Sequence, residues 1–258
     1  MNSALRQVIG IFGAIVALVW VLTARELPLT PEERTHWMAA SAPLTAQIEA
    51  MAAGACQSPL LGEALSALHA LGVSADGARL AMAGVSAALC AWLWRLGSLY
   101  RRWAGWALGL AMLLALTLSG AAFRLSPAPL SALFGAMALY YWVRWLQTRR
   151  AEAAAAWHVG LLLALYAHAG ATLLWAGIAL AFWLTRWRNP GFYEVFRRRW
   201  AWHHALIALL WLPGAVLTLP AWARCFDRTG SPGEVLLWVA MGIAPLALTA
   251  LLSSADCE

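Results

Sequence analysis

The stretch "LALYAHAGATLLW", residues 163–175, decides how often the chain changes direction. It lies inside a long apolar block, residues 153–187, and about 20 apolar residues are enough to cross a bilayer. It also places His168 beside the Ala169-Gly170 pair, and glycine lowers the local helix propensity. We therefore expect two helices, roughly 151–168 and 171–187, that meet near His168.

Composition sets the class of protein. Hydrophobic residues make up 62% of the 258-residue chain and charged residues only 12%, about half the share of charge in soluble domains. The 17 tryptophans agree with a membrane protein, since indole rings favour the membrane–water interface. The sequence predicts an all-α, polytopic integral membrane protein. The net charge of +6 is explained by arginines in short loops, so we expect no nucleic-acid partner.

The arginines also orient the membrane spans. With residues 2–6 in the cytoplasm, the basic turns at 95–102 and 144–150 also lie inside, as the positive-inside rule requires. The five-arginine segment 186–199 returns inside only if the block 153–187 is divided, which puts His168 at the outer face. The expected spans are 7–23, 79–99, 104–123, 128–147, 151–168, 171–187, 201–220 and 234–252.

We expect these eight helices to leave both termini in the cytoplasm, and the composition rich in Ala, Leu, Arg and Trp favours a bacterial inner membrane. A cleaved signal peptide is the alternative interpretation of 7–23, although "LTARELPL" is a poor cleavage site. We treat residues 1–258 as a single module whose segment 24–78 is a periplasmic loop. The outer turns are expected near 124–129, 168–171 and 221–233.

The periplasmic loop is expected to contain amphipathic helices that lie along the interface. Thr30 is a candidate N-cap with Pro31 in the first turn, and the following acidic pair suits the positive end of that helix. His36 and His69 are expected at the surface. In a second helix, over 59–73, one apolar stripe consists of Leu61, Leu65, Leu68 and Leu71.

Several motifs follow one another in an order known from a family of enzymes. They are the pair Glu32-Glu33, "QSPLL" at 57–61, "ALGVSADGARL" at 70–80, "SGAAFRLSP" at 119–127 and "YAHA" at 166–169. This order resembles bacterial GT-C fold glycosyltransferases, the polyprenyl-phosphate-sugar-dependent enzymes related to protein mannosyltransferases. The resemblance covers roughly residues 7–220.

The resemblance implies sugar transfer from a polyprenyl-phosphate donor at the periplasmic face. Glu32 or Glu33 would be the catalytic base, and Arg124 would bind the donor phosphate, which suits a guanidinium. Tyr166 and His168 would bind substrate, and His168 is also a candidate ligand for a divalent metal. The topology drawn from charge alone puts these residues on one face of the membrane.

The chain also departs from the family pattern. It has Glu-Glu where the family has Asp-Glu, Gln57-Ser58-Pro59 in place of His-Pro-Pro, and small residues at 120–122 where the family has a Gln-Glu pair. A catalytically degenerate GT-C-like subunit of a larger membrane complex, with other membrane protein subunits as partners, is therefore the alternative.

Each candidate also has a purely structural interpretation. The two glutamates can complement a helix N-terminus, and Arg124 can anchor a span end at the lipid headgroups. His168 can form a hydrogen bond at the helix break. Cys56 and Cys225 are both expected outside, where disulfides can form.

Two further classes of protein stay open. The segment "RRRWAWHHALIALLWLPG" at 197–214 resembles the start of haem-binding helices in membrane cytochromes b. His203 or His204 would face His158 in a bis-histidine haem site. A transporter is the remaining class, although the predicted spans lack buried carboxylates.

Overall fold

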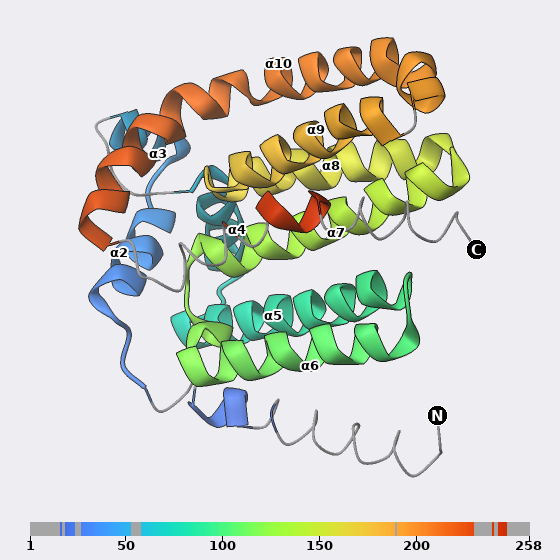
Figure 1. The fold of residues 1–258 in the computed structure, drawn as a ribbon. Helices are drawn as coiled ribbons and strands as arrows, with labels where there is room; N and C mark the ends of the chain where they lie inside the picture. Colours follow the sequence, from blue (N-terminus) through green and yellow to red (C-terminus); the bar gives the residue numbers. More distant parts are fainter. Residues whose placement is uncertain are drawn as a thin grey trace. The chain divides into compact units, whose positions relative to one another are not determined.

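The computed structural model describes residues 16, 19–23, 27–52, 58–188, 190–229, 239 and 242–246, and these residues form helices and turns without a strand (Figure 1). The all-α prediction is confirmed. The helices are α2 (Pro31–Ala40), α3 (Leu44–Ala52), α4 (Pro59–Ala70), α5 (Ala75–Ser98), α6 (Arg102–Ser119), the 3-10 helix η1 (Ala121–Phe123), α7 (Pro127–Thr148), α8 (Ala151–Ala167), α9 (Ala171–Arg188) and α10 (Pro190–Thr229).

The chain divides into two compact units. The first comprises Met1–Pro43 and Leu61–Leu133, and the second comprises Leu44–Leu60 and Phe134–Glu258. Each unit therefore consists of two separate segments of the sequence.

The first unit packs α2 and α4 against the beginning of α5 and the turn that follows α6. Its buried cluster consists of Ala40, Leu61, Leu65, Ala78, Met82 and Leu125. The predicted stripe of α4 is thus confirmed for Leu61 and Leu65, and Leu68 packs partly buried against the cluster. Leu71 lies just beyond the helix and is 78% exposed, because α4 ends at Ala70 and Gly72, at φ +73°, turns the chain.

Two glycines let α5 and α6 form a tight antiparallel hairpin. A Cβ on Gly97 would lie 2.7 Å from the carbonyl oxygen of Ala104, and one on Gly105 would lie 2.4 Å from that of Trp94. Both distances are shorter than van der Waals contact, so the two backbones meet where a side chain has no room. α6 then ends at Gly120, whose φ of +64° suits a glycine.

We expect Gly105→Ala to lower the free energy of unfolding by about 1–3 kcal/mol, the usual effect of overpacking a close contact. The added Cβ would strike backbone atoms, which cannot move aside cheaply. Gly84→Ala is the matched control in α5, because its Cβ would meet nothing within 4 Å and alanine favours a helix by about 1 kcal/mol. Thermal unfolding in detergent micelles would test both, and equal effects would contradict the packing argument.

The second unit contains α3, α8, α9, α10 and most of α7. The break predicted from the charge pattern is confirmed, because α8 ends at Ala167 and α9 begins at Ala171. His168 has an extended backbone, with φ −159° and ψ 130°. Helix α8 lies close to α7, since a Cβ on Gly160 would approach the carbonyl oxygen of Phe134 to 3.2 Å.

Helix α10 corrects two predictions. The basic segment 186–199 was expected to be a loop, and 221–233 an outer turn, yet α10 runs without interruption over 40 residues from Pro190 to Thr229. The physical reason is that charge decides whether a segment meets water but does not end a helix, while proline at the first position favours a helix start. At 1.5 Å per residue the helix is about 60 Å long.

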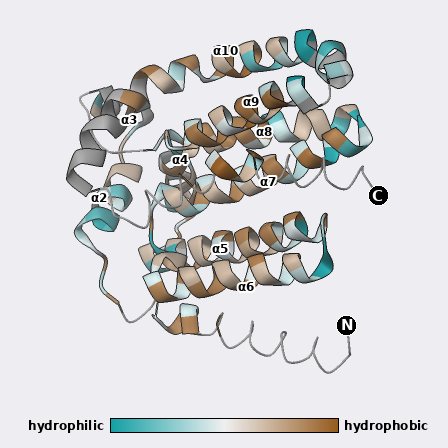
Figure 2. Ribbon diagram, viewed as in Figure 1, coloured by the Kyte–Doolittle hydropathy of each residue, from teal (hydrophilic) through white to brown (hydrophobic). Residues whose placement is uncertain are grey.

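Among the described residues, α5 and α6 are long and apolar enough to cross a membrane, whereas α8 and Ala171–Leu184 of α9 are apolar but shorter. Figure 2 shows the apolar residues that run along α5 and α6. The number of eight spans stays a prediction. Most of the spans 7–23 and 234–252 and the side chains of Cys56 and Cys225 lie outside the described residues.

Candidate functional site

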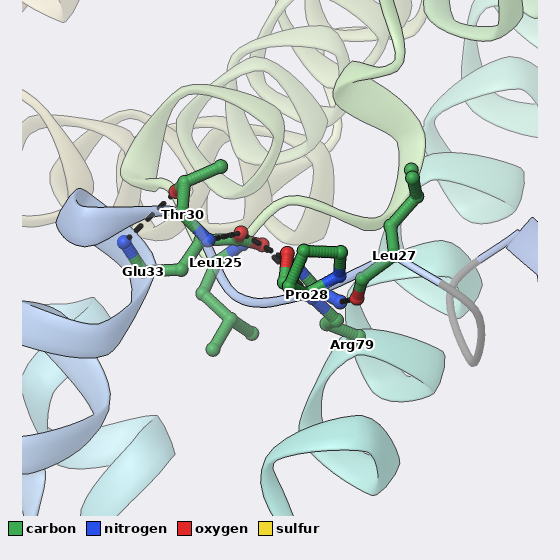
Figure 3. Close-up of polar contacts among 6 residues, drawn as sticks. All are labelled: Leu27, Pro28, Thr30, Glu33, Arg79 and Leu125. Atoms are coloured by element: carbon green, nitrogen blue, oxygen red, sulfur yellow. Dashed lines mark hydrogen bonds and ion pairs between the residues drawn. The ribbon is translucent and has the colours of Figure 1, made fainter.

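The acidic pair at the start of α2 is divided between two environments. Glu33 and Arg79 are both buried and form a double contact: Arg79 Nε donates to Glu33 Oε1 at 3.1 Å and Nη2 to Oε2 at 2.7 Å (Figure 3). The guanidinium also donates to the carbonyl oxygens of Leu27 and Pro28. Such bidentate pairs fix geometry as well as charge.

Glu33 also receives backbone hydrogen bonds from two segments. Its Oε2 accepts from the Thr30 N–H at 2.9 Å, while the Thr30 hydroxyl accepts from the Glu33 N–H, which completes a capping box and confirms the predicted helix start. Its Oε1 accepts from the Leu125 N–H at 3.2 Å. Glu33 therefore joins the start of α2 to α5 and to the turn after η1.

These contacts decide the ionisation of Glu33. Burial alone raises its pKa, but the hydrogen bonds from Arg79, Thr30 and Leu125 outweigh burial, and the net pKa is lowered. The carboxylate is charged, enclosed and fully used as an acceptor. Its geometry suits a structural group better than a catalytic base.

Glu32 is the accessible member of the pair. Its side chain is 70% exposed, and its Oε1 lies 3.7 Å from Nε2 of His36, one turn later in α2. His36 lowers the pKa of Glu32 most strongly, and Arg124 lowers it further, while burial and the charge of Glu33 raise it. Glu32 is therefore ionised at neutral pH and faces solvent.

Arg124 follows the 3-10 helix η1, in the turn between α6 and α7, as the sequence predicted. Its side chain is exposed, and the neighbouring Leu125 N–H is held by Glu33. Arg124 and Glu32 both belong to the first unit, and the positive charge of Arg124 lowers the pKa of Glu32. This is an arrangement that can hold an anionic group next to a base.

Tyr166 and His168 belong to the second unit, and both have structural partners there. The Tyr166 hydroxyl donates to the Leu210 carbonyl oxygen of α10 at 2.8 Å, and its ring occupies the space beside Gly214. His168 Nδ1 accepts from the Gly170 N–H at 2.9 Å. In a neutral ring this leaves the proton on Nε2.

Ser58, from the expected periplasmic loop, lies at the same helix end. Its hydroxyl donates to the carbonyl oxygen of Tyr166 at 3.3 Å, which satisfies one of the last carbonyl groups of α8. Ser58 and the break at His168 therefore lie at the same end of α8.

No match was found. Comparisons of the chain with protein-family models, with curated proteins and with solved structures gave none. The resemblance to GT-C glycosyltransferases therefore rests on the motifs of the sequence and stays a prediction.

The histidines predicted to pair across the second unit do come together. Nδ1 of His203 lies 2.6 Å from Nε2 of His158, and the ring centroids are 4.4 Å apart. A bis-histidine haem site would need room for the iron between the two imidazole rings, and these two hydrogen-bonded rings leave none. Among the described residues no three metal-binding side chains converge.

Sequence reasoning missed Arg79 and misjudged His36. Arg79 appeared only as part of a motif. An arginine one turn inside an apolar helix requires a partner, so its position in the sequence could have predicted an ion pair. His36 was expected at the surface but is 7% exposed and contacts Glu32. Its burial follows from the packing of α2, which the one-dimensional pattern does not contain.

The Glu33 contacts predict a dependence of stability on pH. The pKa of Glu33 is lower in the folded state than in the unfolded chain, so its contribution is complete above the ordinary glutamate pKa of about 4.3 and is lost as pH falls through the folded-state value. We expect the free energy of unfolding to fall more steeply in acid for the natural protein than for Glu33→Gln. Equal slopes between pH 6 and pH 3 would contradict this.

Proposed function

We propose that the protein is a membrane glycosyltransferase that takes a sugar from a polyprenyl-phosphate donor at the periplasmic face of a bacterial inner membrane. The observation that carries the proposal is the combination of an ionised, exposed Glu32 with an exposed Arg124 in one unit. The motif order described above supports the same chemistry.

The membrane location is supported by the exposed face of α6. Trp103, Leu108, Leu110, Leu114 and Leu118 are all exposed, although a helix of this hydropathy in a soluble core would be mostly buried. Contact with lipid chains would remove these apolar side chains from water. The helix is about 27 Å long, which approaches the thickness of the hydrocarbon layer.

Glu32 would act as the general base. Its carboxylate would accept the proton of an acceptor hydroxyl, whose oxygen then attacks the anomeric carbon of the donor sugar. The bond between that carbon and the phosphate oxygen breaks, and polyprenyl phosphate leaves. His36 and Arg124 keep Glu32 ionised, so the proton acceptor is ready at neutral pH.

Arg124 would stabilise the leaving phosphate. Negative charge grows on the phosphate oxygen during the transfer, and a guanidinium placed beforehand in the site compensates for it without reorganisation. Tyr166 and His168, in the second unit, are kept as a separate proposal: they would bind substrate through the phenol oxygen and the Nε2–H group.

A second candidate function has its own support. Glu33 is fully engaged by Arg79, and the Tyr166 hydroxyl is already used by α10, which leaves fewer free polar groups than a transferase site usually offers. A catalytically degenerate subunit of a larger membrane complex is consistent with this.

Reconstituted vesicles would test transfer directly. The purified protein, supplied with radiolabelled polyprenyl-phosphate mannose or glucose and membrane acceptors, should consume donor. Arg124→Gln should lower the rate roughly 10- to 100-fold, since a hydrogen bond to a charged group contributes about 1.5–3 kcal/mol. The exposed Arg34→Gln in α2 is the matched control and should change little.

Three outcomes are distinguishable. Donor loss that depends on the protein and on Arg124 supports the transferase. Donor loss at the rate of empty vesicles contradicts it for these sugars. A stoichiometric co-purifying protein, unaffected by Glu32→Gln combined with Glu33→Gln, supports the subunit.

A further inference from the structure

The corner between α5 and α6 carries a basic cluster that the proposed transfer does not use. Arg95 lies in the last turn of α5, Arg101 is the residue before α6 and Arg102 is its first residue. All three side chains are exposed. The close contact of the two helices at Gly97 and Gly105 brings these helix ends together, so the three guanidinium groups share one end of the hairpin.

The cluster has no acidic counterpart in its own hairpin. The sequence contains no aspartate or glutamate between Asp76 and Glu152. Asp76 lies in the first turn of α5, at the end opposite to the corner, and Glu152 lies in α8. The corner therefore carries three positive charges in a stretch of sequence without a carboxylate.

Indole rings surround the same corner. Trp103 is 67% exposed and Trp94 is 37% exposed, while the Arg95 guanidinium lies 4.9 Å above the ring centroid of Trp92. Exposed indoles next to arginines at the end of two apolar helices are the arrangement expected at the headgroup layer of a bilayer. They mark the depth at which phosphate groups lie.

We infer that this corner binds the headgroups of anionic phospholipids. Arg95, Arg101 and Arg102 contact the phosphate groups, and Trp94 and Trp103 insert beside them at the interface. The charge topology puts the corner at the cytoplasmic leaflet, whose surface is negative, and each arginine near such a surface contributes about 1 kcal/mol of attraction. The inference rests on the proposed membrane location but not on sugar transfer.

Native mass spectrometry of the detergent-purified full-length protein tests the inference. The protein is mixed with equal amounts of phosphatidylglycerol and phosphatidylcholine of the same acyl chains, and bound lipids are counted. We expect a preference for phosphatidylglycerol that falls at least tenfold in the triple variant Arg95→Gln, Arg101→Gln, Arg102→Gln. The triple lysine variant keeps the charge and should stay within threefold of the natural protein.

A scattered control removes the same net charge elsewhere. Arg34→Gln, Arg150→Gln and Arg197→Gln together replace three exposed arginines, in α2, directly before α8 and in α10, and should change the preference less than threefold. An equal loss in this control would overturn the inference, because total charge would then explain the binding. So would an unchanged preference in the triple glutamine variant, or an equal loss in the lysine variant. Lipid preference and donor consumption are measured separately. Failure of the lipid-binding inference can therefore be distinguished from failure of the proposed sugar transfer.

Discussion

Replacing Arg79 by methionine should lower the free energy of unfolding by about 3–5 kcal/mol, which is the usual effect of removing one partner of a buried ion pair. Methionine fills most of the volume of the arginine stem but leaves the Glu33 carboxylate buried without its counter-charge. It also removes the donors to the carbonyl oxygens of Leu27 and Pro28. The loss therefore comes from stranded polar groups and not from a cavity.

Equilibrium unfolding in mixed micelles would measure this effect. Arg34→Met, at an exposed position of the same unit, is the matched control and should cost less than about 0.5 kcal/mol. The double variant Glu33→Gln, Arg79→Met removes the stranded charge while glutamine preserves the capping box, so it should be more stable than Arg79→Met alone. A single-variant loss below 1 kcal/mol would show that the pair is not coupled to folding.

Exchanging Glu32 for glutamine should lower the proposed transfer rate about 10²- to 10⁴-fold, the range that general-base catalysis supplies. The amide keeps the size and the exposed position of the side chain but does not accept the proton of the acceptor hydroxyl. Stability should change little, because the Glu32 side chain is 70% exposed and lies 3.7 Å from His36, too far for a strong hydrogen bond. The expected signature is thus loss of turnover in a protein that folds normally.

Two other glutamates of the first unit, Glu63 and Glu33, serve as controls for this test. Glu63→Gln, an exposed carboxyl of α4 in the same unit, should leave turnover unchanged. Glu33→Gln should lower stability and turnover together, since it loosens the joint that holds Glu32 and Arg124. If Glu32→Gln retained full activity while Glu33→Gln retained stability but lost activity, the assignment of the base would move to Glu33.

The sequence predicted those parts of the fold that depend on local chemistry and charge. Five arginines at 186–199 required a second change of direction, and the chain does break at His168, where Gly170 donates to the imidazole. Thr30 and Pro31 predicted the start of α2, because a capping box depends only on four consecutive residues. The turn that carries Arg124 was likewise found from apolar length and a single charge.

Features that depend on tertiary contacts could not be predicted in the same way. Glu32 and Glu33 are adjacent and chemically identical, and only the position of Arg79, 46 residues later, separates an enclosed carboxylate from an accessible one. The end of α4 before Leu71 and the continuation of α10 through Arg197–Arg199 depend on small differences in helix stability. Charge patterns do not report those differences.

The capped ion pair has a consequence for how this chain can diverge. A lineage that loses only the acid at 33 or only the guanidinium at 79 passes through an intermediate several kcal/mol less stable, comparable to the whole stability margin of many domains. We therefore expect homologous chains to keep both residues or to exchange both for apolar ones, so that the two positions covary. Positions 32 and 124, which lie in solvent, are free to drift independently unless the chemistry proposed for them is under selection.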